Sequence, residues 1–264
     1  MSYARILYKD TQSEDTKMGL ELKYAGKLCV ALDVPCLRDA LRLADALREL
    51  AKYFKVGLEL YSSAGPAAVE SLVADGHSVI LDLKLHDIPN TVGRAVRQIS
   101  SLGASFITIH ASGGPDMIRA AREGAQSAKL PESERTKLLA VTVLTSITDS
   151  SLRKMFGVRK SLKEAVLDLA LLAKDSGADG AVASASEVRS IKNLCGKEFL
   201  VATPGIRPQG SEKGDQKRAA TPSQALSAGS DIIIVGRPIT QAEDPCAVAL
   251  AILKEMESAK KRRK

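Results

Sequence analysis

Short apolar segments that alternate with amphipathic helical stretches constrain the fold of this chain more than any other feature. The segments lack the strict alternation of a sheet with one face in water, which favours parallel strands buried on both faces. Eight strands are predicted: Leu28–Asp33, Phe54–Leu58, Ser78–Lys84, Phe106–His110, Leu138–Leu144, Gly180–Ser184, Phe199–Thr203 and Ile232–Gly236. The helices predicted between them include Leu37–Ala51, Gly65–Asp75, Thr91–Leu102, Pro115–Ser127, Leu162–Ser176 and Pro222–Ala228. Eight such units predict an α/β fold, a closed (β/α)8 TIM barrel, better than an open doubly wound sheet.

A chain of 264 residues without a composition break fits one such barrel. We expect a polar leader at 1–26, a catalytic barrel at 27–257 and a basic tail at 258–264. No apolar run approaches the roughly 18–20 residues of a membrane span, and the first residues lack the apolar core of a secretory signal. The sequence therefore predicts a cytoplasmic protein with no membrane partner.

The net charge of +7 comes mainly from the end of the chain, because five positive residues occupy Lys260–Lys264. A basic tail on a nearly neutral body is typical of a solvated terminus, and contact with a polyanion is the less favoured interpretation. Aromatic residues make up only 3% and Trp is absent, so surfaces for stacking on bases are poorly supplied. We expect no specific nucleic acid partner.

The cysteines and histidines show no metal-binding pattern. The four cysteines, Cys29, Cys36, Cys195 and Cys246, form no C-x-x-C pair, and the three histidines form no H-E-x-x-H motif. Glycine-rich dinucleotide and P-loop fingerprints are also missing. The sequence predicts neither a metal nor an organic cofactor.

The strongest candidate site lies at the end of the third predicted strand. Period-two geometry places Asp82 and Lys84 on one face of that strand, pointing into the mouth of a barrel, and Asp87 follows in the loop. A charged pair at this place costs desolvation free energy and is rarely kept for stability alone, although a structural ion pair is the alternative.

Two neighbouring strands add charges at a comparable depth. Asp33 closes the first strand, where it could instead be a helix N-cap, and Lys55 lies within the apolar second strand, where it needs a partner. With Asp82, Lys84 and Asp87 they predict an alternating cluster of acids and bases. Such an array suits proton transfer or the stabilisation of a carbanion.

The last two strands predict an anion site. Gly205 and Arg207 follow the seventh strand, and Gly236 and Arg237 follow the eighth, which is where barrels commonly bind phosphate. We interpret the stretch 208–217 between them as a mobile loop that closes over a ligand. His110, at the end of the fourth strand, is either a ligand group or a hydrogen-bonded structural histidine.

At these residues the sequence resembles the orotidine 5'-phosphate decarboxylase family, from about Leu28 to Met256. The segment from Asp82 to Thr91 (DLKLHDIPNT) resembles the family signature, and Val141–Ser146, Thr203–Gly210 and Val235–Thr240 resemble its bacterial form. The resemblance implies conversion of orotidine 5'-monophosphate to uridine 5'-monophosphate and CO2 in pyrimidine synthesis, with no cofactor. It also implies a homodimeric barrel with active sites near the interface.

The resemblance also implies a role for each site residue. Lys84 would protonate C6 of the pyrimidine, and Asp82 would lie beside the departing carboxylate. Asp87, Ile88 and Thr91 would come from the partner subunit. The other implied substrate contacts are Asp33 and Lys55 at the ribose, where Lys55 also completes the catalytic charges, Thr145 and Ser146 at the base, and Arg207, Gln216, Gly236 and Arg237 at the phosphate.

Two alternatives remain open at this point. A related phosphosugar enzyme, such as a hexulose-phosphate synthase or a keto-gulonate-phosphate decarboxylase, resembles the chain in its Asp-x-Lys-x-x-Asp strand but uses Mg²⁺ and lacks the continuation from Ile88 to Thr91. A non-catalytic barrel that binds nucleotide or RNA through the basic tail is the second alternative. Sensitivity to EDTA would favour the first, and loss of nucleic acid binding on truncation before Lys260 would favour the second.

Overall fold

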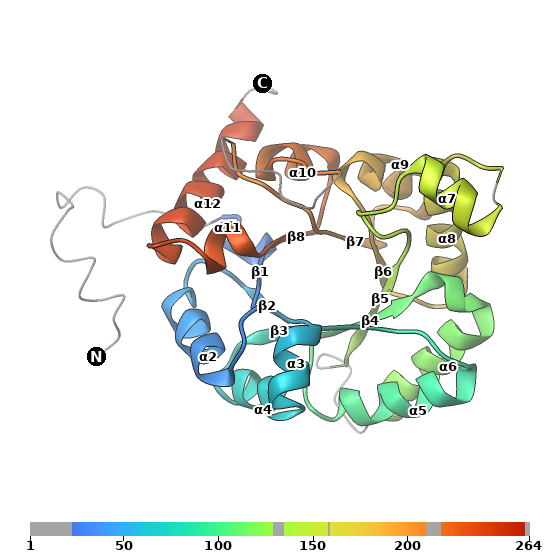
Figure 1. The fold of residues 1–264 in the computed structure, drawn as a ribbon, viewed down its shortest axis with the longest axis horizontal. Helices are drawn as coiled ribbons and strands as arrows, with labels where there is room; N and C mark the ends of the chain where they lie inside the picture. The colour runs from blue at the N-terminus through green and yellow to red at the C-terminus, as the bar shows by residue number, and fades with distance from the viewer. Residues whose placement is uncertain (1–22, 129–134, 158, 210–217, 262–264) are drawn as a thin grey trace, which may run out of the picture.

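The computed structural model describes residues 23–128, 135–157, 159–209 and 218–261, and it contains a closed barrel of eight parallel strands in sequence order (Figure 1). The strands are β1 (Leu28–Ala31), β2 (Tyr53–Val56), β3 (Ser78–Leu85), β4 (Phe106–His110), β5 (Lys137–Val141), β6 (Gly180–Val182), β7 (Leu200–Thr203) and β8 (Ile232–Val235). Pairing of β1 with β8 closes the barrel. The predicted (β/α)8 architecture is confirmed.

The helices form a ring outside the strands (Figure 1). They are α2 (Leu37–Ala46), α3 (Leu58–Ala64), α4 (Ala67–Ala74), α5 (Pro89–Ser100), α6 (Gly114–Ser127), α7 (Asp149–Phe156), α8 (Leu162–Asp175), α9 (Ala185–Cys195), α10 (Pro222–Ala228), α11 (Arg237–Thr240) and α12 (Pro245–Lys261). Short 3-10 turns precede β1 (Ala25–Lys27) and follow β4 (Ala111–Gly113). Among the described residues, none of these helices is both long enough and apolar enough to cross a bilayer.

Local sequence signals explain where several helices begin and end. Reciprocal capping boxes start α8 at Ser161 and α10 at Thr221, so their first backbone N–H groups are satisfied by side chains. Helix α10 then ends at Gly229, whose φ of 106° is accessible to glycine at little cost. Gly65, at φ 60°, separates α3 from α4, so the single helix predicted from Gly65 begins two residues later.

Two apolar layers hold the barrel together. The outer layer, between strands and helices, contains residues such as Leu28, Val30 and Leu81. The inner layer fills the barrel with the alternate strand positions Cys29, Ala31, Ile80, Phe106, Leu139, Ala202, Ile232 and Ile234. The strands are therefore buried on both faces, as their sequences indicate.

The predicted ends of the barrel domain differ from the structure in detail. Residues 1–22 of the predicted leader and 262–264 of the predicted tail lie outside the described residues. Tyr24, which was expected in the leader, is only 8% exposed and packs against the outer layer, because the turn Ala25–Lys27 brings it onto the barrel. Helix α12 continues to Lys261, beyond the predicted limit at 257. The division into leader, barrel and tail otherwise stays a prediction.

Candidate active site

An irregularity in β3 shapes the centre of the candidate site. Leu81 pairs with Ile107 on β4 and Leu85 pairs with Ile109, so three residues of β3 lie opposite Thr108 alone. Lys84, inside this bulge, has φ 51°, and in the described chain it is the only residue other than glycine with a positive φ. Non-glycine residues adopt this region at a cost, and such strain concentrates at functional sites.

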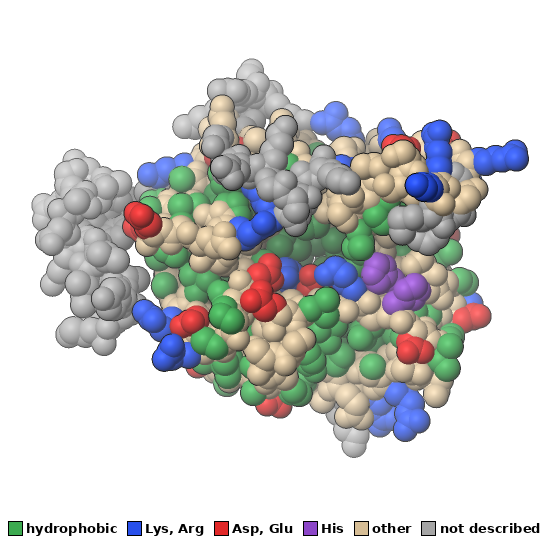
Figure 2. All heavy atoms as spheres, in the orientation of Figure 1, with side chains coloured by type: hydrophobic (Ala, Val, Ile, Leu, Met, Phe, Trp, Pro, Cys, Tyr) green, Lys and Arg blue, Asp and Glu red, His purple; other side chains and the backbone are tan. Residues whose placement is uncertain are grey.

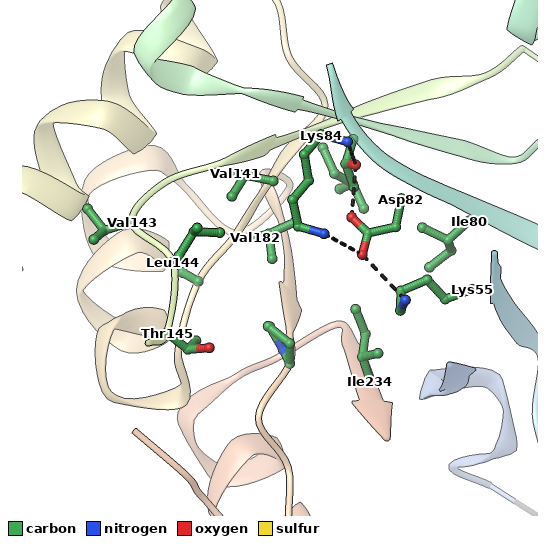
Figure 3. A pocket seen from close by; sticks show the side chains of 14 residues that line it. Lys55, Ile80, Asp82, Lys84, Val141, Val143, Leu144, Thr145, Val182 and Ile234 are labelled. Carbon is green, nitrogen blue, oxygen red and sulfur yellow. Dashed lines mark hydrogen bonds and ion pairs between the residues drawn. The ribbon is translucent and has the colours of Figure 1, made fainter. Parts of the chain in front are cut away.

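Asp33 after β1, Lys55 on β2, and Asp82 and Lys84 on β3 form a charged row across the carboxyl ends of the barrel. Figure 3 shows the last three of them. Lys55 Nζ lies 3.1 Å from Asp33 Oδ1 and 3.5 Å from Asp82 Oδ2. Lys84 Nζ donates a hydrogen bond of 2.8 Å to the same Asp82 Oδ2. Acid and base alternate along the row, so each internal charge has opposite charges on both sides. Figure 2 shows charged and histidine side chains gathered near the centre of this face.

Burial and neighbouring charges act in opposite directions on the two inner members. The side chain of Lys55 is 11% exposed and that of Asp82 is 13% exposed. Burial lowers the pKa of Lys55, but the carboxylates of Asp82 and Asp33 outweigh it and hold that pKa above its ordinary value. Burial likewise acts to raise the pKa of Asp82, yet Lys55 and Lys84 outweigh it and the pKa is lowered. Both groups therefore carry their charges at neutral pH.

A cavity with mainly apolar walls adjoins the charged row. Ile80, Val141 and Ile234 lie on the barrel side, and Leu144 and Thr145 lie across from the lysines (Figure 3). The remaining lining side chains are Thr108, Leu139, Val143, Val182, Ala183 and Pro204. A ligand in this cavity would meet ammonium and carboxylate groups on one side and hydrocarbon on the other. Electrostatic interactions are stronger in such a partly dry site than in water.

The predicted phosphate residues lie at the ends of β7 and β8. Burial and the neighbouring cation Arg237 lower the pKa of Arg207, so the structure brings the two guanidinium groups near each other. The backbone at Gly236 passes close to the charged row, since a Cβ there would lie 3.5 Å from Asp33 Oδ2. Gln216 and the rest of residues 210–217, which make up most of the predicted loop 208–217, lie outside the described residues.

Other predicted residues stay apart from the cavity within this chain. Asp87 was expected in the charged cluster, but it lies in the exposed loop after β3. Its carboxylate accepts a hydrogen bond of 2.6 Å from the backbone N–H of Ile88. Ile88 is 66% exposed, and Thr91 and Ser146 are also exposed. Within the single chain the charged row therefore has four members, and the place of Asp87 in an active site stays a prediction.

Two inward-facing residues of β4 extend the site. Thr108, which our sequence analysis missed, contacts both Asp82 and the backbone of Lys84. The signal was available, because the period of two that turns Phe106 inward also turns Thr108 and His110 inward. The ring of His110 lies 5.2 Å from that of His86. Burial lowers the pKa of His110, and the neighbouring His86 and Lys84 act in the same direction.

Within the described residues, no group of three or more His, Cys, Asp or Glu side chains is arranged to hold a metal ion. The absence of a metal and of a cofactor stays a prediction.

The fold and the charged row define a (β/α)8 barrel with an enzyme-like site at the carboxyl ends of its strands, where barrels place their catalytic residues. A family model described as the orotidine 5'-phosphate decarboxylase / HUMPS family matches residues 26–252, and the chain belongs to this family. The predicted resemblance is confirmed, and with it the prediction that the chain is an enzyme of this family.

Individual relatives agree with this assignment. The chain is 47% identical over 238 residues to the orotidine 5'-phosphate decarboxylase of Moorella thermoacetica. This match covers 89% of this chain and 93% of that protein. It is 48% identical over 229 residues to the enzyme of the same name from Streptococcus pneumoniae, with 86% and 94% covered. A crystal structure of orotidine 5'-phosphate decarboxylase from Lactobacillus acidophilus has a TM-score of 0.75 at 42% identity and covers 87% of this chain and 98% of that chain.

Proposed function

We propose that this protein decarboxylates orotidine 5'-monophosphate to uridine 5'-monophosphate and CO2, without a metal or an organic cofactor, in the synthesis of pyrimidine nucleotides. The observation that carries the proposal is the row Asp33–Lys55–Asp82–Lys84 beside an apolar cavity, in a chain whose named relatives match it over most of its length. Cytoplasmic location belongs to the proposal, and the four free thiols of the chain fit a reducing compartment.

Lys84 is the proton donor in this mechanism. Loss of CO2 from C6 leaves an electron pair in the plane of the pyrimidine ring, where the π system does not delocalise it. A fixed ammonium group next to that carbon stabilises the charge as it forms and then delivers a proton. The hydrogen bond of 2.8 Å to Asp82 holds the Lys84 ammonium in one place, which supports this role.

Asp82 has two roles in the proposal. It keeps Lys84 positioned and protonated, and it places a negative charge beside the carboxylate that leaves. Lys55 balances the charge of Asp82 from the other side and, with Asp33, is proposed to hold the ribose hydroxyls. The ionised state of Asp82 and Lys55 at neutral pH supports both roles.

The remaining predicted contacts complete the proposed substrate site. Thr145 lines the cavity across from the lysines, and we propose that it reads the pyrimidine base together with Ser146. The phosphate group is proposed to bind between Arg207 and Arg237, with Gly236 and Gln216. Since this binding takes place far from C6, its free energy can assist the reacting centre.

A homodimer is part of the proposal. Asp87, Ile88 and Thr91 are exposed at the barrel mouth in the single chain, and a second copy is proposed to receive them at its own active site. The exposure of Ile88 (66%) and of Leu58 (59%), which also follows a strand at this end of the barrel, supports an interface here.

A spectrophotometric assay with orotidine 5'-monophosphate, with and without EDTA, tests the proposed function. We expect loss of substrate absorbance with uridine 5'-monophosphate as the product, and an unchanged rate in EDTA. Lys84→Ala should abolish turnover and keep most of the affinity for a nucleotide 5'-monophosphate. Turnover that EDTA abolishes would contradict cofactor independence, and full activity of Lys84→Ala would contradict the role of Lys84.

A further inference from the structure

Thr108 occupies a special position in the barrel. It lies on the inner face of β4, it is only 2% exposed, and it is the single residue of β4 opposite the bulge of β3. Thr108 is therefore the only side chain of β4 that lies opposite the polar groups of Asp82, Leu83 and Lys84 in the bulge. A buried hydroxyl at such a place needs partners of its own.

The hydroxyl group of Thr108 joins the backbone of one site residue to the side chain of another. It accepts a hydrogen bond of 2.9 Å from the backbone N–H of Lys84, and it donates one of 2.9 Å to Asp82 Oδ1. The directions are fixed, because an amide can only donate and an ionised carboxylate can only accept. The single hydroxyl proton is therefore committed to Asp82.

These two bonds hold the unusual conformation of Lys84. The bulge takes the amide of Lys84 out of the regular ladder between β3 and β4, and its φ of 51° costs free energy. Thr108 Oγ1 gives that amide a partner to replace the missing backbone carbonyl. The same atom holds one oxygen of Asp82, so that the other oxygen remains for Lys55 and Lys84.

We infer that Thr108 is a positioning residue, which sets the Lys84 ammonium and the Asp82 carboxylate in their productive arrangement through one shared hydroxyl group. The inference rests on the proposed function, since it assigns Thr108 to that reaction. Thr108 acts through its two neighbours and has no step of its own. A small displacement of a catalytic group is enough to slow a reaction about 100-fold.

Three variants at this position separate the hydroxyl group from the rest of the side chain. Thr108→Val keeps the branched shape and removes the hydroxyl, Thr108→Ser keeps the hydroxyl and removes the methyl, and Thr108→Ala removes both. Circular dichroism and thermal melting identify the variants that fold. If Thr108→Val does not fold, Thr108→Ala compared with Thr108→Ser asks the same question.

Steady-state kinetics with orotidine 5'-monophosphate are the measurement. We expect kcat of Thr108→Val to fall by about 10- to 100-fold with KM changed less than about threefold, since positioning acts on the reacting groups. Thr108→Ser should keep kcat within a few fold of wild type. An unchanged kcat in Thr108→Val, or an equal loss in the Val and Ser variants, would overturn the inference.

The pH profile of kcat adds a measurement that packing alone would not change. Burial raises the pKa of Asp82, while Lys55, Lys84 and the hydrogen bond from Thr108 lower it. Thr108→Val should therefore move the acidic limb of the profile to higher pH, and Thr108→Ser should not move it. An acidic limb that stays in place in Thr108→Val would count against the inference.

Wild-type protein and Lys84→Ala are assayed together with these variants. They distinguish failure of the proposed function from failure of the inference about Thr108. An inactive wild type would reject the proposed function and the inference together. An active wild type with an inactive Lys84→Ala and a fully active Thr108→Val would reject the role of Thr108 alone.

Discussion

Lys55 illustrates how a single buried charge can be kept at low cost. Its ammonium group lies between two carboxylates, Asp33 and Asp82, and its side chain is 11% exposed. Burial disfavours the ion, and the paired carboxylates restore it. The same arrangement leaves Asp82 dependent on Lys55, because Asp82 is nearly as buried and has only Lys84 as a second neighbouring cation in the row.

Removal of Lys55 should therefore destabilise the protein as well as inactivate it. Lys55→Met fills most of the space without the charge, and it leaves Asp82 with one cation in place of two. We expect the free energy of unfolding to fall by about 3 kcal/mol, a value typical of a broken buried ion pair. Urea denaturation of wild type and variant measures it. In a double-mutant cycle, Lys55→Met should lower the free energy of unfolding much less in the Asp82→Leu background than in wild type. Losses that simply add would contradict this coupling.

His110 makes stability sensitive to pH in a defined direction. Burial lowers its pKa, its neighbours His86 and Lys84 add to the effect, and Asp82 opposes it. Because the unfolded chain then binds a proton more readily than the folded protein, the free energy of unfolding falls as pH drops from about 6.5 toward the lowered pKa. His77, whose pKa burial also lowers, contributes in the same direction.

His110→Gln should remove its share of this acid sensitivity. We expect the fall in melting temperature between pH 7.5 and pH 5.5 to be smaller in His110→Gln than in wild type. His77→Gln is the comparison for a histidine away from the site, and the double variant should be the least sensitive of the four proteins. A wild-type slope in His110→Gln would show that His110 titrates alike in the folded and unfolded states.

At the scale of elements, two loops that lead into strands each use an aspartate side chain to bind the backbone of the preceding strand. In the segments Ser176–Asp179 and Ala228–Asp231, a glycine follows the end of a helix and an aspartate directly precedes the next strand. Asp179 Oδ2 accepts a hydrogen bond of 2.8 Å from the N–H of Leu138, and Asp231 Oδ2 accepts one of 2.8 Å from the N–H of Val201. Each carboxylate thus fastens the start of its own strand to the strand before it.

Substitution of Asp179 should lower the free energy of unfolding substantially. The carboxylate also pairs with Arg122 at 3.0 Å and with Arg135 at 3.4 Å, and all three side chains are largely buried. Asp179→Ala leaves two guanidinium groups and a strand N–H without this partner, so we expect a loss of about 3 kcal/mol in the free energy of unfolding. Chemical denaturation checks this. Asp179→Asn keeps an acceptor for Leu138 and should lose less, and equal losses would point to the charge alone.

The number, type and order of the strands could be predicted, because each strand is a short apolar run bounded by helical periodicity. The exact ends of the strands could not be predicted. The irregular end of β3, where Lys84 takes its unusual φ, depends on the pairing of β3 with β4, which the sequence of β3 alone does not define. Helix α3 was missed because the apolar residue Leu58, now its first residue, continues the strand pattern. Arg218 was missed as well: it contacts Glu187 on α9 and the carbonyl groups of Val143 and Leu144, far away in sequence.

Some residues of the candidate site could likewise be predicted from the sequence, and others could not. Asp33, Lys55, Asp82 and Lys84 could be predicted to meet, since period-two geometry turns them into one barrel mouth. The period of two also turns Thr108 into the barrel, but Thr108 is uncharged and belongs to no motif, so its role follows from its contacts with Asp82 and Lys84. Asp87 could not be placed by strand geometry, because it lies beyond the last paired residue of β3. In the proposed dimer, its position relative to a site depends on the second chain.

At the scale of the whole molecule, the proposed dimer makes each active site depend on two chains. Lys84 would act in the chain that carries it, and Asp87 would act in the partner. Two variants that are each inactive, Lys84→Ala and Asp87→Asn, should then complement each other. A mixed dimer contains one site with both substitutions and one site with neither.

Subunit exchange provides the measurement. After the two inactive variants are mixed in equal amounts and allowed to exchange, half of the dimers are mixed by statistics and each has one intact site, so we expect about one quarter of wild-type activity. Each variant incubated alone under the same conditions is the control. If Asp87 served the site of its own chain, every site in the mixture would carry one substitution and no activity would return. That result, obtained with exchange verified by a mass tag on one variant, would exclude the shared active site.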